Sequence, residues 1–96
     1  MIIEFNKALM YLDKEEYEKA ERQLKKAICV AKENNKDYEL VTIQCCYGDL
    51  LYRLGRIEEA TIYLDKVVSY YEETYEHKYE YDIAKEILDH INNEKK

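Results

Sequence analysis

The chain of 96 residues contains no proline and only two glycines, Gly48 and Gly55. These two residue types interrupt regular structure most strongly, so a chain nearly free of them favours long, continuous elements. Apolar residues recur at steps of three and four throughout, which is the period of an amphipathic helix. No segment alternates with the period of two that a half-buried strand requires. The sequence therefore predicts an all-α protein.

Five segments carry the helical period, and short polar stretches separate them. The segments cover residues 2–12, 16–34, 38–54, 57–77 and 79–93. The apolar stripe of the second segment is Tyr17, Ala20, Leu24, Ala27, Ile28 and Ala31. The stripe of the fourth segment is Ile57, Ala60, Leu64, Val67, Val68, Tyr71 and Tyr75. We therefore expect five helices joined by short turns, with each stripe facing a core.

The residues between the segments predict where helices begin and end. Asp13, with Glu16 three residues on, resembles a capping box for the second helix. Asn34 and Asn35 should end that helix, and Asp37 can cap the next one.

The second and fourth segments repeat each other at a distance of 40 residues. A shift by this distance lays Ala20 on Ala60, and in the preceding helices it lays Ala8 on Gly48. Small residues thus coincide with small ones, and the large apolar residues coincide likewise. This register across two helices and a turn indicates an internal repeat.

The two copies differ at the turn between their helices, where one has Gly55 and the other has Glu15. We expect Gly55 to adopt a left-handed backbone conformation, which glycine tolerates best. The first turn lacks glycine, so we expect it to rely on the Asp13 cap. Ala20 and Ala60 should lie where the helices of each hairpin cross, because larger side chains there would overpack the contact.

This pattern resembles the tetratricopeptide repeat family. The better copy, residues 47–68, matches the family's small and large positions at Gly48, Leu51, Tyr52, Gly55, Ile57, Ala60, Leu64 and Val67. The earlier copy, residues 8–28, matches at Ala8, Tyr11, Leu12, Tyr17, Ala20, Leu24 and Ala27. The offset of 40 residues exceeds the family's usual period of about 34, and the family's proline is absent. The chain is therefore similar to long-period members of the family.

The resemblance implies an α-solenoid of antiparallel helical hairpins within one domain, residues 1–96. Repeat one would cover about residues 1–36, repeat two about residues 37–77, and a capping helix about residues 79–93. Each hairpin of such a fold has an apolar face that a neighbouring element must cover.

The resemblance also implies a groove that holds a peptide or helix of a partner protein and is lined by the first helix of each hairpin. The matching positions are Ile2, Phe5, Leu9, Leu12, Thr42, Cys45, Asp49, Tyr52 and Arg53. The first four are all apolar, and Ile3 and Met10 add a second apolar line. We interpret these residues as a docking surface for a partner helix or a second copy of the chain. Packing within the protein is the alternative.

Tyrosines are concentrated in the second half of the chain, with six of the eleven between residues 63 and 81. Tyr63 and Tyr70 lie off the core stripe, and Ile62 is beside them. Tyrosine suits protein interfaces because it buries a large area and keeps a polar group. We therefore include Ile62, Tyr63 and Tyr70 among the candidate partner-binding residues. The alternative is that they pack against the last helix.

Charge and composition argue against several classes of function. The net charge is −6, and the 15 Lys and Arg are scattered among 21 Asp and Glu, so the cationic footprint that nucleic acid requires is absent. No apolar run approaches the ~18 residues of a membrane span. The three cysteines lack a Cys-x-x-Cys spacing, which favours reduced thiols in a cytoplasmic protein.

The sequence also lacks the motifs of catalytic and cofactor sites. It has no nucleophile elbow, phosphate-binding glycine loop or His–carboxylate constellation, so we expect neither an enzyme nor a cofactor. The pairs Glu73/His77 and Glu86/His90 offer only two ligands each, so we expect no metal site. The sequence predicts a protein–protein interaction module that binds a protein or peptide, as an adaptor, a chaperone-like holder or an immunity-type binder. The alternative is a homodimer, formed through the first or last helix, whose assembly is its function.

Overall fold

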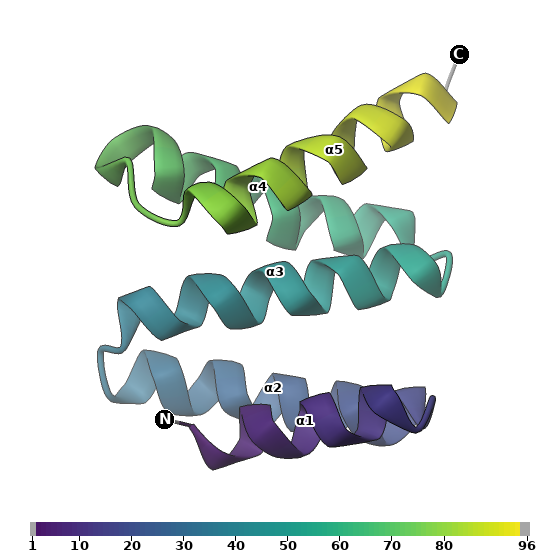
Figure 1. Cartoon of the computed structure of the whole chain (residues 1–96), viewed down its shortest axis with the longest axis vertical. Coiled ribbons are helices and arrows are strands. Elements are labelled where there is room, and N and C mark those ends of the chain that lie inside the picture. Colours follow the sequence, from purple (N-terminus) through teal and green to yellow (C-terminus); the bar gives the residue numbers. More distant parts are fainter. Residues whose placement is uncertain (1, 95–96) are drawn as a thin grey trace. The chain divides into compact units, whose positions relative to one another are not determined.

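The computed structural model describes residues 2–94, and these residues form five α-helices (Figure 1). The helices are α1 (Ile3–Asp13), α2 (Tyr17–Glu33), α3 (Asp37–Arg53), α4 (Ile57–Thr74) and α5 (Lys78–Glu94). This confirms the all-α class and each of the five helical segments. The chain divides into two compact units, Met1–Ile43 and Gln44–Lys96, and the division falls within α3.

The first unit is built on the hairpin of α1 and α2, which pack against each other. Its core is lined by small and medium side chains that have no exposed surface, namely Ala8, Ala20, Leu24, Ala27 and Ala31. Alanines at these positions let the two helices approach closely, which confirms the predicted stripe from Ala20 onward. Tyr17, the first residue of that stripe, is 38% exposed because it lies at the very start of α2.

The second unit contains the rest of α3 together with α4 and α5. Its core includes Tyr47, Leu51, Ala60, Leu64, Val67 and Ala84, each at most 1% exposed. Gly48 lies directly against this core. A Cβ atom at position 48 would lie 2.7 Å from Cδ2 of Leu64, which is closer than real Cβ contacts come. A larger residue at position 48 would therefore force the Leu64 side chain to move.

Three helices end with the same hydrogen-bonded turn, and each places one residue in the left-handed region. After α1 that residue is Glu15 (φ 59°), after α2 it is Asn35 (φ 54°), and after α3 it is Gly55 (φ 80°). In each turn the following amide donates to the carbonyl five residues back; Glu16 N–H to Tyr11 O spans 2.9 Å. This is the Schellman geometry, which satisfies carbonyls that the helix end leaves without partners.

The repeat of 40 residues is thus present in the backbone. The amide of Arg56 donates to the carbonyl of Leu51 at 2.9 Å, in the same way as Glu16 and Tyr11. The conformation predicted for Gly55 is confirmed. The predicted Asp13 cap is wrong: Asp13 is the last residue of α1, and the N-cap of α2 is Glu16, which makes no side-chain capping bond. The first turn relies instead on Glu15 adopting a left-handed conformation.

The assignment of Tyr75 to the core stripe of α4 is also wrong. The helix ends at Thr74, and Tyr75 is its C-cap with a φ of 59°. The change of backbone direction moves the side chain away from the stripe, and it is 78% exposed.

Candidate functional site

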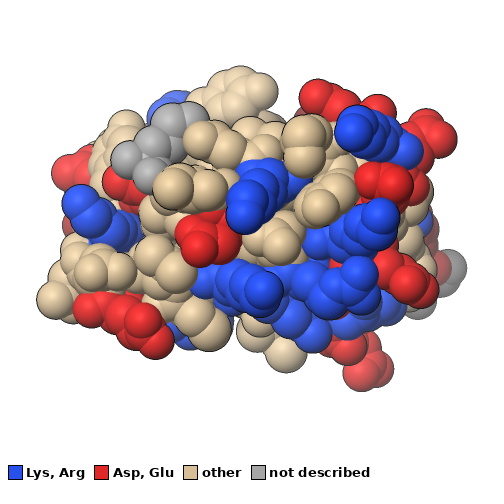
Figure 2. All heavy atoms as spheres, turned by 90° about the horizontal axis from the view of Figure 1, so that it is seen from below, with Lys and Arg blue, Asp and Glu red and all other residues tan. Residues whose placement is uncertain are grey.

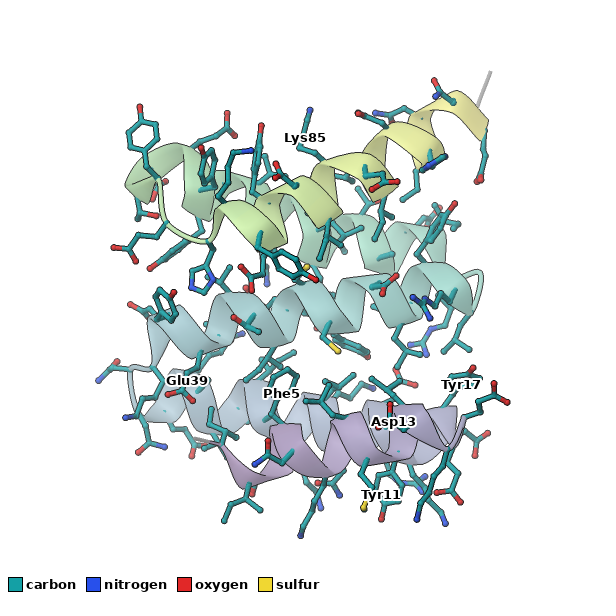
Figure 3. The ribbon with its side chains drawn as sticks, in the orientation of Figure 1. Phe5, Tyr11, Asp13, Tyr17, Glu39 and Lys85 are labelled. Carbon is teal, nitrogen blue, oxygen red and sulfur yellow. The ribbon has the colours of Figure 1, made fainter. Side chains whose placement is uncertain are left out.

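The first unit has a hollow of about 300 Å³ between α1 and the start of α3. Its lining residues are Phe5 from α1, and Tyr38, Glu39 and Thr42 from the first two turns of α3 (Figure 3). Phe5 is half-buried and Tyr38 is 61% exposed, so the two rings provide an apolar wall that solvent reaches. Glu39 supplies a carboxylate at its edge. The hollow can therefore accept an apolar side chain that has a cationic or hydrogen-bond-donating neighbour.

A second hollow of about 360 Å³ lies beside the first and shares Glu39 with it. It is formed by the start of α1, the end of α2 and the turn into α3. Its lining residues are Ile2, Ile3, Glu4, Val30, Asn34, Lys36 and Glu39.

The four apolar candidates of the first helix occupy different environments. Ile2 is buried and lines the second hollow, and Phe5 is half-buried and lines the first. Leu9 is 40% exposed and Leu12 is half-buried, but neither lines one of these two hollows. The structure thus brings Phe5 together with Thr42, while Leu9 and Leu12 lie farther along α1.

Sequence reasoning missed Tyr38 and Glu39, which supply half of the lining of the first hollow. One signal was available: Tyr38 and Thr42 are four apart and therefore lie on one side of α3. Their meeting with Phe5 depends on how the chain enters α3, and the turn at Asn35 determines that.

The candidates at the end of α3 are engaged with nearby side chains. Arg53 Nε lies 3.3 Å from the Asp49 carboxylate, one helical turn away. The Tyr52 hydroxyl donates to Glu94 Oε1 at the end of α5, at 3.1 Å. This hydrogen bond raises the pKa of Tyr52, because the phenol must stay protonated to donate it. Asp49, Tyr52 and Arg53 therefore form local polar contacts within the second unit.

The three candidates on α4 have different contacts. Ile62 is 56% exposed. The ring of Tyr63 packs on Tyr47 with ring centroids 4.8 Å apart. The ring of Tyr70 meets that of His77 edge-on at 5.7 Å. Tyr63 and Tyr70 each make a ring contact within the second unit and remain half-buried, and Ile62 is the most exposed of the three.

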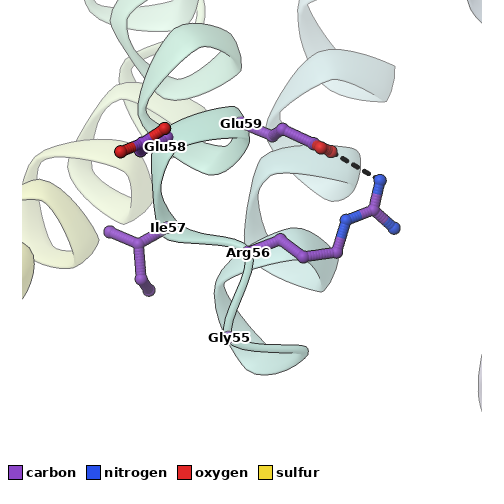
Figure 4. A pocket seen from close by; sticks show the side chains of 5 residues that line it. All are labelled: Gly55, Arg56, Ile57, Glu58 and Glu59. Atoms are coloured by element: carbon purple, nitrogen blue, oxygen red, sulfur yellow. Dashed lines mark hydrogen bonds and ion pairs between the residues drawn. The ribbon is translucent and has the colours of Figure 1, made fainter.

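A third hollow, of about 410 Å³, lies at the turn between α3 and α4 (Figure 4). Five consecutive residues, 55–59, line it, and an ion pair between Arg56 and Glu59 borders one side. Because it is formed by one turn, it has no opposing wall to enclose a ligand.

The second hairpin also matches a known family. A model of the tetratricopeptide repeat family matches residues 48–78, from Gly48 through α4 to the first residue of α5. This match supports the resemblance of the chain to the tetratricopeptide repeat family. Neither a curated protein nor a solved structure matches the chain. Tetratricopeptide repeats generally mediate interactions between proteins. The family match covers both Gly55 and Ala60, the turn and the crossing residue on which the sequence resemblance rests.

The three thiols differ in accessibility. Cys29 on α2 is exposed. Burial raises the pKa of Cys45 to about 12 and that of Cys46 to about 11. The Cys45 Sγ also lies 3.6 Å from the backbone carbonyl of Glu80, toward which it can donate. Both thiols of α3 therefore stay protonated near neutral pH and are poor nucleophiles.

His77 lies in a different environment from the one its sequence neighbours predict. The sequence pattern placed it on the fourth helical segment, but α4 ends at Thr74, and the His77 side chain is 2% exposed. Its Nδ1 lies 3.1 Å from the Glu80 carboxylate. Within residues 2–94 the structure contains no group of three or more His, Cys, Asp or Glu that could hold a metal ion. No helix in the same range is long and apolar enough to cross a membrane.

Proposed function

We propose that the protein holds a short helix or peptide of a partner protein in the hollow lined by Phe5, Tyr38, Glu39 and Thr42. The observation that carries this proposal is the position of the hollow on α1 and α3, the first helices of the two hairpins. The family resemblance implies that this side of the repeat holds peptides. The role would be that of an adaptor, a chaperone-like holder or an immunity-type binder, without catalysis.

The lining of the hollow suggests the chemistry of the bound segment. Two aromatic rings would bury an aliphatic or aromatic anchor of the partner. Glu39 would pair with a Lys, an Arg or an N-terminal amine beside that anchor. The net charge of −6 would also favour the approach of a basic partner, because it raises the local concentration of cations.

Selection from a library of random peptides tests this proposal. We expect the wild-type chain to enrich peptides that have an apolar residue next to Lys or Arg. Phe5→Glu should abolish this enrichment, and Glu39→Lys should shift it toward peptides with Asp or Glu. The matched control is Met10→Glu, which also adds a carboxylate to an exposed position of α1 and should leave the enrichment unchanged. Equal enrichment by wild type and Phe5→Glu, with both chains folded by circular dichroism, would contradict the proposal.

The homodimer remains the second candidate function, and the exposed apolar residues of α1 favour it. Ile3 is 65% exposed, Met10 is 46% exposed and Leu9 is 40% exposed. If a second copy covers these residues, sedimentation should give twice the chain mass of 11.6 kDa. Ile3→Glu and Met10→Glu should then restore the mass of a single chain. A wild-type mass of 11.6 kDa at high salt would exclude this apolar dimer.

A further inference from the structure

The second helices of the two hairpins expose equivalent positions. Apart from its first residue, Tyr17, helix α2 has eight exposed residues, at positions 18, 19, 22, 25, 26, 29, 32 and 33. The residues 40 positions later in α4 are also all exposed, at 58, 59, 62, 65, 66, 69, 72 and 73. We call these two sets the α2 face and the α4 face. Because they have the same spacing and exposure, their charges can be compared position by position.

The two faces carry opposite charge. The α2 face has five cations and two anions, with Lys19, Arg22, Lys25, Lys26 and Lys32 against Glu18 and Glu33. The α4 face has one cation and five anions, with Lys66 against Glu58, Glu59, Asp65, Glu72 and Glu73. The formal charges are therefore +3 and −4. Figure 2, which views the molecule from the side of α1 and α2, shows Lys and Arg side chains gathered in a band across that side.

Most of these charges are not neutralised by their own hairpin. On α2, Lys19 pairs with Glu16 at 3.5 Å and Lys25 lies 3.8 Å from Glu21, both as exposed contacts along the helix. Within residues 2–94 the structure records no ion pair for Arg22, Lys26 or Lys32. The same holds on the α4 face for Asp65, Glu72 and Glu73.

We propose that the α2 face of one chain binds the α4 face of a second copy of the same chain. A second copy is the partner that the structure supports, because it carries a face of opposite charge whose exposed positions have the same spacing along the helix. The net charge of −6 opposes a nucleic acid at this position, because its phosphates would be repelled at long range. An apolar partner would remove several cations from water without pairing them, which is costly.

An antiparallel pairing of the two faces brings opposite charges together at three positions, and the same register places Lys25 opposite Lys66, Glu18 opposite Glu73 and Glu33 opposite Glu58. If Cys29 lies opposite Ile62, then Lys26 faces Asp65, because both are three residues away. By the same spacing Lys32 faces Glu59, and ten residues from the centre Lys19 faces Glu72. The centre would thus join a thiol to the exposed side chain of Ile62, with charge pairs on both sides.

The association should be weak and sensitive to salt. Exposed ion pairs contribute little individually, and salt screens such charges beyond about 10 Å at 0.1 M. We expect sedimentation at about 20 mM salt to give a mass above that of one chain, 11.6 kDa, and the mass to return to 11.6 kDa at about 0.5 M salt. The protein concentration should extend to about 1 mM, which covers weak dissociation constants.

Charge reversal on either face, followed by mixing, tests the pairing directly. Lys26→Glu with Lys32→Glu changes the formal charge of the α2 face from +3 to −1, and Asp65→Lys with Glu72→Lys changes that of the α4 face from −4 to 0. Each double variant alone should stay at 11.6 kDa at low salt. An equimolar mixture of the two should associate again, because the unaltered α4 face of the first variant (−4) then meets the unaltered α2 face of the second (+3).

Two control variants distinguish this pairing from a general effect of net charge and from an apolar dimer. Lys7→Glu with Lys14→Glu changes the net charge equally at exposed positions outside the α2 face, and should leave low-salt association intact. Met10→Glu should also leave it intact, which distinguishes the pairing from an apolar dimer through α1. A wild-type chain that remains at 11.6 kDa at low salt would overturn the proposal. Failure of the mixture to associate would overturn it as well.

Discussion

The turns after α1 and α3 use one backbone conformation with two different residues. Glu15 has a φ of 59° and Gly55 a φ of 80°, and the amides that follow them make equivalent hydrogen bonds of 2.9 Å. A left-handed residue other than glycine is disfavoured by contact of its Cβ with the backbone. The ends of these helices therefore require this geometry, and the first hairpin accepts the cost of forming it without glycine.

The two hairpins also share a core register while they differ at the surface. Ala20 and Ala60 are both fully buried, as are Leu24 and Leu64. Their outer faces have opposite charge. Exposed positions of a helix tolerate such differences, because substitutions there usually change stability little. Repetition of the core and divergence of the surface are what a scaffold for interactions requires. Variants at equivalent positions test how far the equivalence of the hairpins extends.

The largest effect is expected from truncating the equivalent core leucines. Leu24→Ala and Leu64→Ala should each lower the free energy of unfolding by about 2–5 kcal/mol, because both side chains are fully buried and each change leaves a cavity. Urea denaturation followed by circular dichroism measures this loss. Leu54→Ala is the control, since Leu54 is 41% exposed and its loss should be smaller. If only one core leucine were costly, the two cores would not be equivalent.

A smaller effect is expected at the helix contact of the second hairpin. Gly48→Ala should cost about 1–2 kcal/mol, because the new methyl group meets Leu64 and this outweighs the gain in helix propensity. In the first hairpin, Ala8→Gly should cost about 1 kcal/mol through propensity alone. The double variant Gly48→Ala with Leu64→Ala should be less destabilised than the sum of its parts. Additive losses would show that Gly48 and Leu64 are not in close contact.

Exchanging the turn residues should give effects of about 1 kcal/mol with opposite signs. Gly55→Glu should destabilise the protein, because it introduces a Cβ at a φ of 80°. Glu15→Gly should stabilise it, because glycine relieves the same cost at a φ of 59°. Thermal unfolding of both variants measures the two changes. A loss of stability in both would mean that the Glu15 side chain makes a favourable contribution that outweighs its backbone cost.

The smallest effect on stability concerns the thiols. A maleimide should label Cys29 readily at neutral pH and change the unfolding free energy by less than ~0.5 kcal/mol, because the side chain is exposed. Cys45 and Cys46 should resist labelling, because their pKa values of about 12 and about 11 keep them protonated. Mass spectrometry after digestion distinguishes the sites. Rapid labelling of Cys45 in the folded chain would be evidence against its burial.

The same pKa values predict how stability changes at high pH. The folded-state pKa of Cys45 lies above its usual value of 9.0, so its contribution to stability is fully present below pH 9. That contribution is lost as the pH rises toward about 12, because the unfolded thiol ionises first. Cys45→Val should reduce the loss of stability over this range.

The helices, their repeat and the tight position of Gly48 could be predicted from sequence, because each depends on local periodicity or residue size. The environments of Tyr75 and His77 could not. Periodicity assumes that a helix continues, and α4 ends at Thr74, after which the chain changes direction. The hollow at Phe5 was predicted in part, since its apolar character is visible in the sequence. Whether Tyr38 meets Phe5 depends on the path of the chain into α3, and no local sequence pattern predicts that path.

The turn between α4 and α5 has a consequence for how the protein opens. It contains two left-handed residues other than glycine, Tyr75 at a φ of 59° and His77 at a φ of 68°. Each costs about 1–2 kcal/mol, and the packing of α5 must hold both in place. Release of α5 would recover this energy, so α5 should form the least protected cooperative unit of the second half of the chain. Its amide hydrogens should then exchange with solvent deuterium before those of α4, and exchange of both helices at one rate would refute this order of opening.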